Sequence, residues 1–158
     1  ICFVQSGSYV DLIRQYTGRE YPPGDFVDAD GNVLGRHRGI IRYTVGQHKG
    51  LGIPSAVPLY VREIRPEDNT VVLGREEELY ASSLAARGVN WIAWDRLDTP
   101  ARVTARIRYR QKEQPATVRQ TGEDEIRVEF DEPQRAVTRG QAVVLYDGEL
   151  VLGGATIV

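Results

Sequence analysis

Residues 101–112 read ARVTARIRYRQK, and polar side chains alternate with apolar ones along this stretch. Successive side chains of a strand point to opposite faces, so the pattern predicts a β-strand with one face in a core. The other face would carry the arginines at even positions, Arg102, Arg106, Arg108 and Arg110. No acidic residue lies between Asp98 and Glu113, so two interpretations of this row stay open. It is either a phosphate-binding face or the ordinary solvated outer face of a barrel strand.

Other short β-type runs lie on both sides of this strand and are separated by turn signals such as Asp147-Gly148. They are WIAWDRL (91–97), ATVRQT (116–121), EIRVEF (125–130), QAVVLY (141–146) and ELVLGGATIV (149–158). Several short strands at close spacing are typical of a small closed sheet. Residues 77–158 are therefore predicted to form a C-terminal antiparallel β-barrel.

Residues 1–76 have a different pattern, which predicts a small mixed α/β central module, so the fold class is mainly β. A helix is expected after an N-cap at Ser8, with Val10, Ile13 and Tyr16 on its buried face. A hairpin turning at Asp30-Gly31 and two strands, PLYVREIR and TVVLG, should follow. Residues 76–84, EEELYASSL, are predicted as a short helix or helical turn.

Residues 37–53 of this module, HRGIIRYTVGQHKGLGI, combine frequent glycines with basic side chains. Glycine permits a looped backbone with accessible amide groups, and such a surface can approach an anion closely. His48 and Lys49 are candidates for that contact. The two histidines are eleven residues apart, which is not a metal-ligand spacing, and no metal site is expected.

Bulk composition restricts the classes of function. The net charge of −2 argues against a wholly electrostatic nucleic-acid binder, although arginine outnumbers lysine, which occurs only at positions 49 and 112. No apolar run is long enough to cross a bilayer, so no membrane is expected. The single cysteine, Cys2, fits a reducing, cytoplasmic compartment. It could be a nucleophile, but with no second cysteine the residues alone favour a small buried side chain beside Ile1 and Phe3. The chain starts at Ile1 and contains no Met, which predicts a piece of a longer protein.

Several motifs together resemble the tRNA-specific 2-thiouridylase family. They are ICFV (1–4), GRHRGIIRYTVGQHKGLGI (35–53), RYRQ (108–111), TRGQAVVLYDGE (138–149) and LGGATI (152–157). The resemblance implies an enzyme that puts sulfur on C2 of the wobble uridine of tRNA. It also implies that this chain is the central and C-terminal part of such an enzyme.

The resemblance assigns roles residue by residue. Cys2 matches the cysteine that carries the persulfide, and Arg108, Tyr109 and Gln141 match tRNA-contacting positions. Further candidates for tRNA contact are Arg106, Arg110, Lys49 and His48. The family motif usually reads P-G-Q where this chain has Arg139-Gly140-Gln141, and GQRKG where it has GQHKG.

What is absent from the chain also leads to expectations. The ATP-binding loop and the first catalytic cysteine of the family are not here, so this piece should hold no cofactor and be inactive alone. ATP with Mg is expected in the missing N-terminal domain. The expected partners are tRNA and a sulfur-donor protein carrying a persulfide, and not DNA. Two alternatives stay open: a stand-alone RNA-binding β-barrel, and a domain whose arginine row binds an acidic protein.

Overall fold

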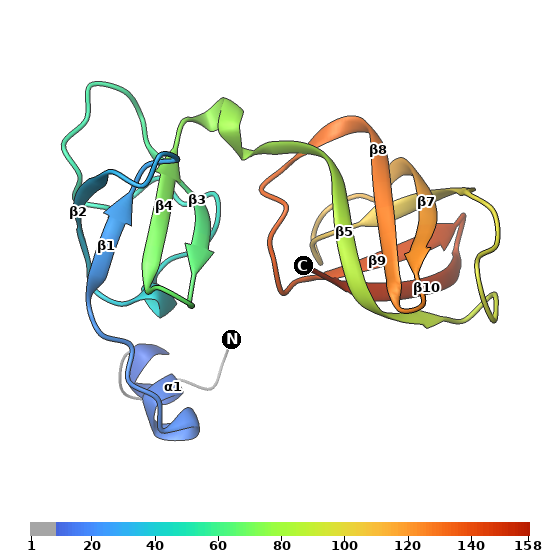
Figure 1. Cartoon of the computed structure of the whole chain (residues 1–158), viewed down its shortest axis with the longest axis horizontal. Helices are drawn as coiled ribbons and strands as arrows, with labels where there is room; N and C mark the ends of the chain where they lie inside the picture. The colour runs from blue at the N-terminus through green and yellow to red at the C-terminus, as the bar shows by residue number, and fades with distance from the viewer. Residues whose placement is uncertain (1–8) are drawn as a thin grey trace. The chain divides into compact units, whose positions relative to one another are not determined.

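The computed structural model describes residues 9–158, so Cys2 and the expected N-cap Ser8 lie outside the described residues. The chain divides into two compact units, one ending at Glu78 and one beginning at Leu79. Figure 1 shows the elements of each unit, and the two units are described separately below.

The first described element of unit 1 is helix α1, Tyr9–Thr17. It ends where Gly18 takes a left-handed conformation (φ 62°) and its N–H donates to the carbonyl of Arg14 at 3.0 Å. Val10 is buried as predicted, but Tyr16 is 87% exposed, which corrects its expected place on the buried face. Six residues correspond to about 1.7 helical turns, so Tyr16 points well away from Val10.

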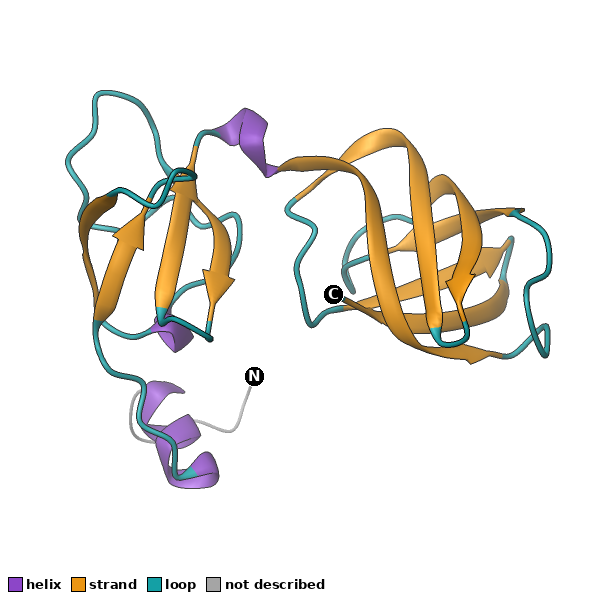
Figure 2. Cartoon of the chain, viewed as in Figure 1, coloured by secondary structure: helices purple, strands orange, loops and turns teal. Residues whose placement is uncertain are grey.

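A four-stranded mixed sheet, with strand order β2-β1-β4-β3, makes up most of unit 1. Its strands are β1 (Gly24–Val27), β2 (Val33–His37), β3 (Tyr60–Arg65) and β4 (Thr70–Gly74). The β1–β2 and β3–β4 pairs are antiparallel, whereas β1 and β4 are parallel (Figure 2). The predicted hairpin is confirmed, because the N–H of Gly31 donates to the carbonyl of Asp28 across its turn. The glycine-rich stretch therefore belongs to the long connection between β2 and β3, with one 3-10 turn at Ile40–Arg42.

Unit 2 is a closed antiparallel barrel with strand order β10-β5-β8-β7-β6-β9, which confirms the predicted barrel. Its strands are β5 (Tyr80–Trp91), β6 (Ala101–Arg106), β7 (Gln114–Gly122), β8 (Glu125–Arg135), β9 (Ala142–Asp147) and β10 (Leu150–Ile157). The inward residues of each strand form one apolar core; on β6 these are Val103 and Ala105, as the alternation predicts.

Two elements near the ends of β5 differ from the prediction. The short helix or helical turn expected over 76–84 is a 3-10 turn, but it covers only Glu76–Leu79, because the chain then pairs with β8 from Tyr80 onward. The expected strand over 91–97 stops after Trp91. The N–H groups of Ile92 and Ala93 both donate to the carbonyl of Leu152, so the regular ladder with β10 ends there.

Candidate nucleic-acid interface

The arginine row does not lie on one strand, which corrects the sequence prediction. β6 ends at Arg106, and after Ile107 the four residues 108–111 form a turn closed by the N–H of Gln111 on the carbonyl of Arg108 (3.1 Å). We call residues 108–111 the Arg108 turn. Arg102 and Arg106 therefore belong to the barrel wall, whereas Arg108 and Arg110 belong to this turn.

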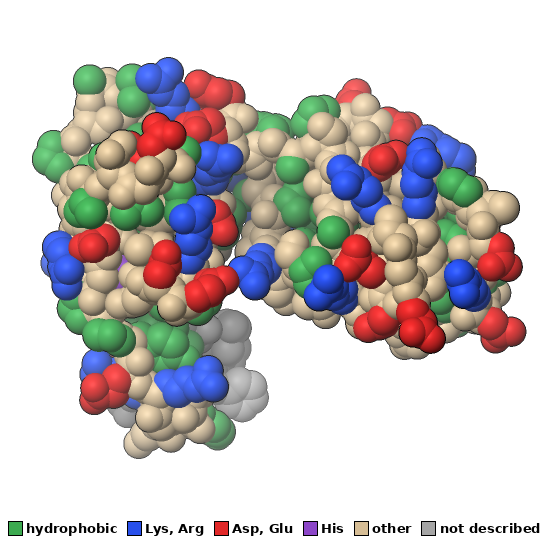
Figure 3. Space-filling view, in the orientation of Figure 1, with side chains coloured by type: hydrophobic (Ala, Val, Ile, Leu, Met, Phe, Trp, Pro, Cys, Tyr) green, Lys and Arg blue, Asp and Glu red, His purple; other side chains and the backbone are tan. Residues whose placement is uncertain are grey.

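The two arginines on the wall have carboxylate partners, one on β8 and one just before β7. Arg102 donates two hydrogen bonds to Asp131, at 2.8 and 2.7 Å, and lowers the pKa of that carboxyl. Arg106 donates to Glu113 at 2.9 Å and lowers its pKa through that hydrogen bond; its guanidinium also lies over the ring of Tyr146. Figure 3 shows acidic side chains beside many of the basic ones on the face in view. The interpretation as a solvated outer face thus fits Arg102 and Arg106.

The Arg108 turn presents a ring between two cations. Tyr109 is 92% exposed, and Arg108 and Arg110 are exposed on either side of it. Nη2 of Arg108 donates to the carbonyl of Ala136 at 2.8 Å, so one edge of the guanidinium is held against the barrel. A guanidinium carries five N–H donors, which leaves others for an anion. An exposed ring flanked by arginines suits stacking on a base together with phosphate contact.

Ala136, whose carbonyl accepts the hydrogen bond from Arg108, has an unusual backbone conformation. It has a left-handed conformation (φ 55°), which a residue with a Cβ rarely adopts. Its N–H donates to the carbonyl of Leu79 at 2.7 Å, and its carbonyl accepts from the hydroxyl of Thr138 as well as from Arg108. These bonds fix the connection between β8 and β9.

Gln141 enters this end of the barrel from the same connection. It directly precedes β9, and the antiparallel register Arg106↔Val144 brings the start of β9 to the end of β6. Its backbone is fixed, because its carbonyl accepts from the N–H of Ile157 at 2.8 Å while its side chain is exposed. The structure thus places Arg108, Tyr109 and Gln141 on two neighbouring segments.

The other candidate cations lie on the glycine-rich connection of unit 1. His48 donates from Nδ1 to the carbonyl of Leu59 at 2.9 Å and stacks on Tyr60, with ring centroids 4.8 Å apart. Lys49 is exposed, and its carbonyl accepts from Nε2 of Gln47 at 2.8 Å. His48 and the loop of residues 50–59 line an open hollow of about 550 Å³. His48 and Lys49 therefore stand on an ordered turn.

His37 does not contribute to a basic surface, although it begins the glycine-rich stretch. Its side chain is 1% exposed. Nδ1 accepts from the N–H of Gly39 at 3.0 Å, and Nε2 donates to the carbonyl of Asn69 at 2.8 Å. The two bonds define the neutral tautomer with the proton on Nε2. Its ring also meets Phe26 and Tyr43 edge to face.

Gly39 shows why this connection needs glycine. Its φ is 118°, and a Cβ there would lie 2.5 Å from the carbonyl oxygen of Tyr21. Only glycine lets the backbone at position 39 pass this close to Tyr21 while its N–H donates to Nδ1 of His37. In this part of the module the glycine packs the interior instead of opening an anion site.

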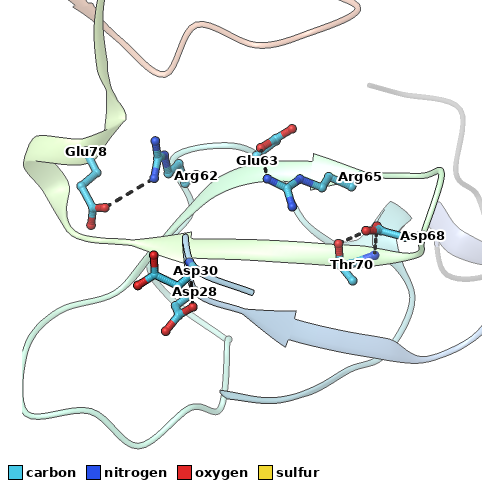
Figure 4. A network of polar contacts seen from close by, with 8 residues as sticks. All are labelled: Asp28, Asp30, Arg62, Glu63, Arg65, Asp68, Thr70 and Glu78. Carbon is cyan, nitrogen blue, oxygen red and sulfur yellow. Dashed lines mark hydrogen bonds and ion pairs between the residues drawn. The ribbon is translucent and has the colours of Figure 1, made fainter. Parts of the chain in front are cut away.

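The acidic residues of unit 1 have local structural contacts. Figure 4 shows Glu78 next to Arg62 (3.5 Å) and Glu63 next to Arg65 (3.1 Å). Asp28 accepts hydrogen bonds from the side chain and backbone of Asn32 in the β1–β2 turn, and these lower its pKa. Across residues 9–158, no group of three potential ligands lies close enough to hold a metal ion. Over the same residues, no helix is long and apolar enough to span a bilayer.

Sequence reasoning missed the residues that support the Arg108 turn. Gln111 and Gln134 form a side-chain hydrogen bond of 3.0 Å, and Ala136 and Thr138 complete the connection. The glutamine that ends RYRQ was visible as part of a motif. Nothing local marks Gln134, because its partner lies 23 residues earlier in the chain.

Comparison with known proteins identifies the class of both units. Residues 10–75 match the family model of the tRNA methyl transferase PRC-barrel domain, and residues 81–157 match the aminomethyltransferase beta-barrel domain. Two β modules of transferase enzymes thus follow one another. The chain belongs to the tRNA-specific 2-thiouridylase family.

Individual relatives agree with this assignment. The chain is 48% identical to the tRNA-specific 2-thiouridylase MnmA of Clostridioides difficile and 53% identical to that of Acetivibrio thermocellus, each over 99% of its length. The corresponding protein of Lachnoclostridium phytofermentans is 49% identical over the full chain. The chain spans 44% of the length of each of these relatives.

Proposed function

We propose that this chain is the tRNA-docking and persulfide-bearing part of an enzyme that adds sulfur to C2 of the wobble uridine of tRNA. Family membership supports the reaction, since the relatives are named for tRNA 2-thiouridylation. The observation that carries the docking role is the Arg108 turn, with Tyr109 92% exposed between two arginines. Aromatic rings and guanidinium planes are the groups on which unpaired RNA bases stack.

Within this proposal the contacts divide by chemistry. Tyr109 stacks on a base, Arg108 and Arg110 neutralise phosphates, and the exposed amide of Gln141 hydrogen-bonds to a base edge or a ribose hydroxyl. His48 and Lys49 supply a second contact from unit 1. Arg106 contributes less than Arg108, because Glu113 already occupies its guanidinium.

The sulfur chemistry belongs to Cys2 and to a part of the enzyme that this chain does not contain. The Cys2 thiolate takes the outer sulfur of a donor protein's persulfide, and the donor leaves as a thiolate. The terminal sulfur of the Cys2 persulfide then attacks C2 of the adenylated uracil, and AMP leaves with the former C2 oxygen. The domain that this chain lacks would hold ATP with Mg, which would supply the adenylyl group that activates the uracil oxygen. A disulfide between Cys2 and a cysteine of that domain releases the product, so this chain alone is inactive. Such thiol chemistry belongs in a reducing cytoplasm.

Binding of an unmodified tRNA with a wobble uridine, measured over a salt series, tests the docking role. Arg108→Ala should weaken binding and lower the slope of log K against log salt by about 0.7 to 0.9, the share of one phosphate contact. Arg87→Ala is the matched control, because Arg87 is exposed and pairs with Glu125. It lies on β5 beside the start of β8, away from the connection between β8 and β9. Equal effects of the two variants would refute the assignment of the turn.

The complete protein separates the proposal from its alternative. A stand-alone RNA-binding module would tolerate Cys2→Ser without loss of thiolation, whereas the proposed enzyme would lose it. If the wild-type chain binds no tRNA even at low salt, docking depends on the other domain.

A further inference from the structure

The Arg108 turn is held at one end by the connection between β8 and β9 and at the other by the last residues of β8. At the first residue, Nη2 of Arg108 donates to the carbonyl of Ala136 at 2.8 Å. At the last residue, Nε2 of Gln111 donates to Oε1 of Gln134 at 3.0 Å. Tyr109, 92% exposed, lies between these two points. The proposed RNA-contacting ring therefore has a fixed base while it touches little of the barrel itself.

Gln134 is well suited to hold the second point. It is only 6% exposed, although its side chain is a polar amide. Its own Nε2 donates to the carbonyl of Glu132 at 2.8 Å, which sets the amide so that Oε1 faces Gln111. A buried amide with both of its groups hydrogen-bonded is rigid, because breaking either bond leaves a desolvated polar group. Gln134 thus transmits the position of β8 to the Arg108 turn.

Gln111 provides evidence that the arrangement serves more than stability. Its Oε1 is buried, and no donor meets it among residues 9–158. A leucine pair at positions 111 and 134 would leave no such orphan acceptor, so an apolar contact would serve the barrel at least as well. The amide pair adds direction, since a hydrogen bond fixes orientation in a way that an apolar contact does not.

We propose that Gln111 and Gln134 are positioning residues that hold the Arg108 turn in the conformation that binds tRNA. This inference rests on the proposed function and adds that the Arg108 turn is ordered before tRNA binds. A turn that is already ordered binds without the entropy loss of ordering Arg108, Tyr109 and Arg110. Neither glutamine needs to touch the RNA.

Releasing the Arg108 turn should therefore weaken tRNA binding without removing any contact with the RNA. If the released turn spends about 10–30% of its time in the competent conformation, the apparent Kd rises about three- to tenfold. The slope of log K against log salt stays at its wild-type value, because the same phosphates are neutralised once the turn has bound.

The test uses the double variant Gln111→Leu, Gln134→Leu in the 158-residue chain. Removing both amides leaves no unpaired side-chain group at this pair. The carbonyl of Glu132 loses its bond from Gln134, but Glu132 is exposed, so the urea midpoint of the barrel should stay near the wild-type value. Unmodified tRNA with a wobble uridine is the probe, and Kd is measured at several salt concentrations. Hydrogen exchange of the backbone N–H of residue 111, which closes the turn on the carbonyl of Arg108, should become faster without RNA.

Gln120→Leu is the matched control. Gln120 also holds a turn, because its amide accepts from the N–H of Leu97 and donates to the carbonyls of Gly122 and Glu123. That turn joins β7 to β8, at the other end of β8 from Gln134. Loss of the Gln120 side-chain hydrogen bonds should leave the Kd for tRNA unchanged.

The outcomes separate this inference from the proposed function. The positioning role would be overturned if the double variant bound tRNA with the wild-type Kd. It would also be overturned if the backbone N–H of residue 111 exchanged at the wild-type rate. A fall in salt slope equal to that of Arg108→Ala would also overturn it, since the variant would then have lost an RNA contact. Failure of the wild-type chain itself to bind would overturn the proposed docking role, and with it the inference.

Discussion

Replacing His37 with leucine should destabilise unit 1 far more than the same change at His48. Leucine fills much of the space of the imidazole but leaves the N–H of Gly39 and the carbonyl of Asn69 without their partner. Each orphaned group costs about 1–3 kcal/mol, nearer the lower end for Asn69, whose bond is only partly buried.

Two further contributions nearly cancel. The edge-to-face contacts of His37 with Phe26 and Tyr43, at centroid distances of 5.6 and 5.8 Å, are lost. Such contacts contribute about 0.5–1.5 kcal/mol each. Burying a leucine returns about 1.5–3 kcal/mol. The expected net loss in the free energy of unfolding is therefore about 3 kcal/mol, against about 1 kcal/mol or less for His48→Leu.

The assay must follow unit 1 by itself. Both tryptophans of the chain, Trp91 and Trp94, belong to the barrel, so tryptophan fluorescence follows unit 2. Urea unfolding should instead be followed by NMR signals of unit 1, with hydrogen exchange at the Gly39 amide as a local readout. Equal losses for the two histidine variants would refute the reasoning that burial and paired hydrogen bonds distinguish them.

Three other changes have definite expected outcomes. Gly39→Ala should cost more than about 1 kcal/mol in urea unfolding, because φ is 118° and Tyr21 blocks the new Cβ; an unchanged midpoint would contradict this. The hydrogen bonds from Arg102 lower the pKa of Asp131 in the folded protein. The stability that this pair contributes is therefore complete above the pKa of Asp131 in the unfolded chain, near 4, and is lost as the pH falls through the lower pKa of the folded state. The stability difference between wild type and Asp131→Asn should therefore shrink below about pH 4 in a pH series of unfolding curves. Cys2→Ser in the complete protein should abolish thiolation while leaving the Kd for tRNA unchanged, measured by 2-thiouridine content and by binding.

The sequence predicted strands well where one face of a strand is buried. The alternation of residues 101–107 places Val103, Ala105 and Ile107 in the interior, and the structure has them buried. The same alternation continues to Tyr109, but the strand stops at Arg106. Periodicity shows which side chains could share a face, while partner strands decide how far the pairing runs.

The unbalanced charge of the arginine row was an artefact of reading one segment at a time. Asp131 reaches Arg102 from β8, 29 residues away, and Glu113 reaches Arg106 from beyond the turn. The buried Gln134 escaped notice for the same reason. Cross-strand partners depend on barrel register, which a single sequence specifies only through the complete fold.

The positions of Cys2, Arg108, Tyr109 and Gln141 in a site came from family resemblance. Physical pattern alone favoured an ordinary buried cysteine at position 2 and left the arginines between two interpretations. The roles of these four residues remain predictions, and the structure adds where three of them lie.

The closure of the barrel by β10 makes the proposed docking site depend on the synthesis of that strand. β10 pairs with β5 through Trp91↔Gly153, and its Ile157 N–H holds the backbone of Gln141. On the ribosome, the Arg108 turn therefore emerges long before the strand that closes the sheet beneath it. A chain terminated before Leu150 would carry every arginine of the turn yet leave β5 and β9 with open edges. Chains that stop before β10 would thus carry the residues of the proposed docking surface without the closed barrel that orders them.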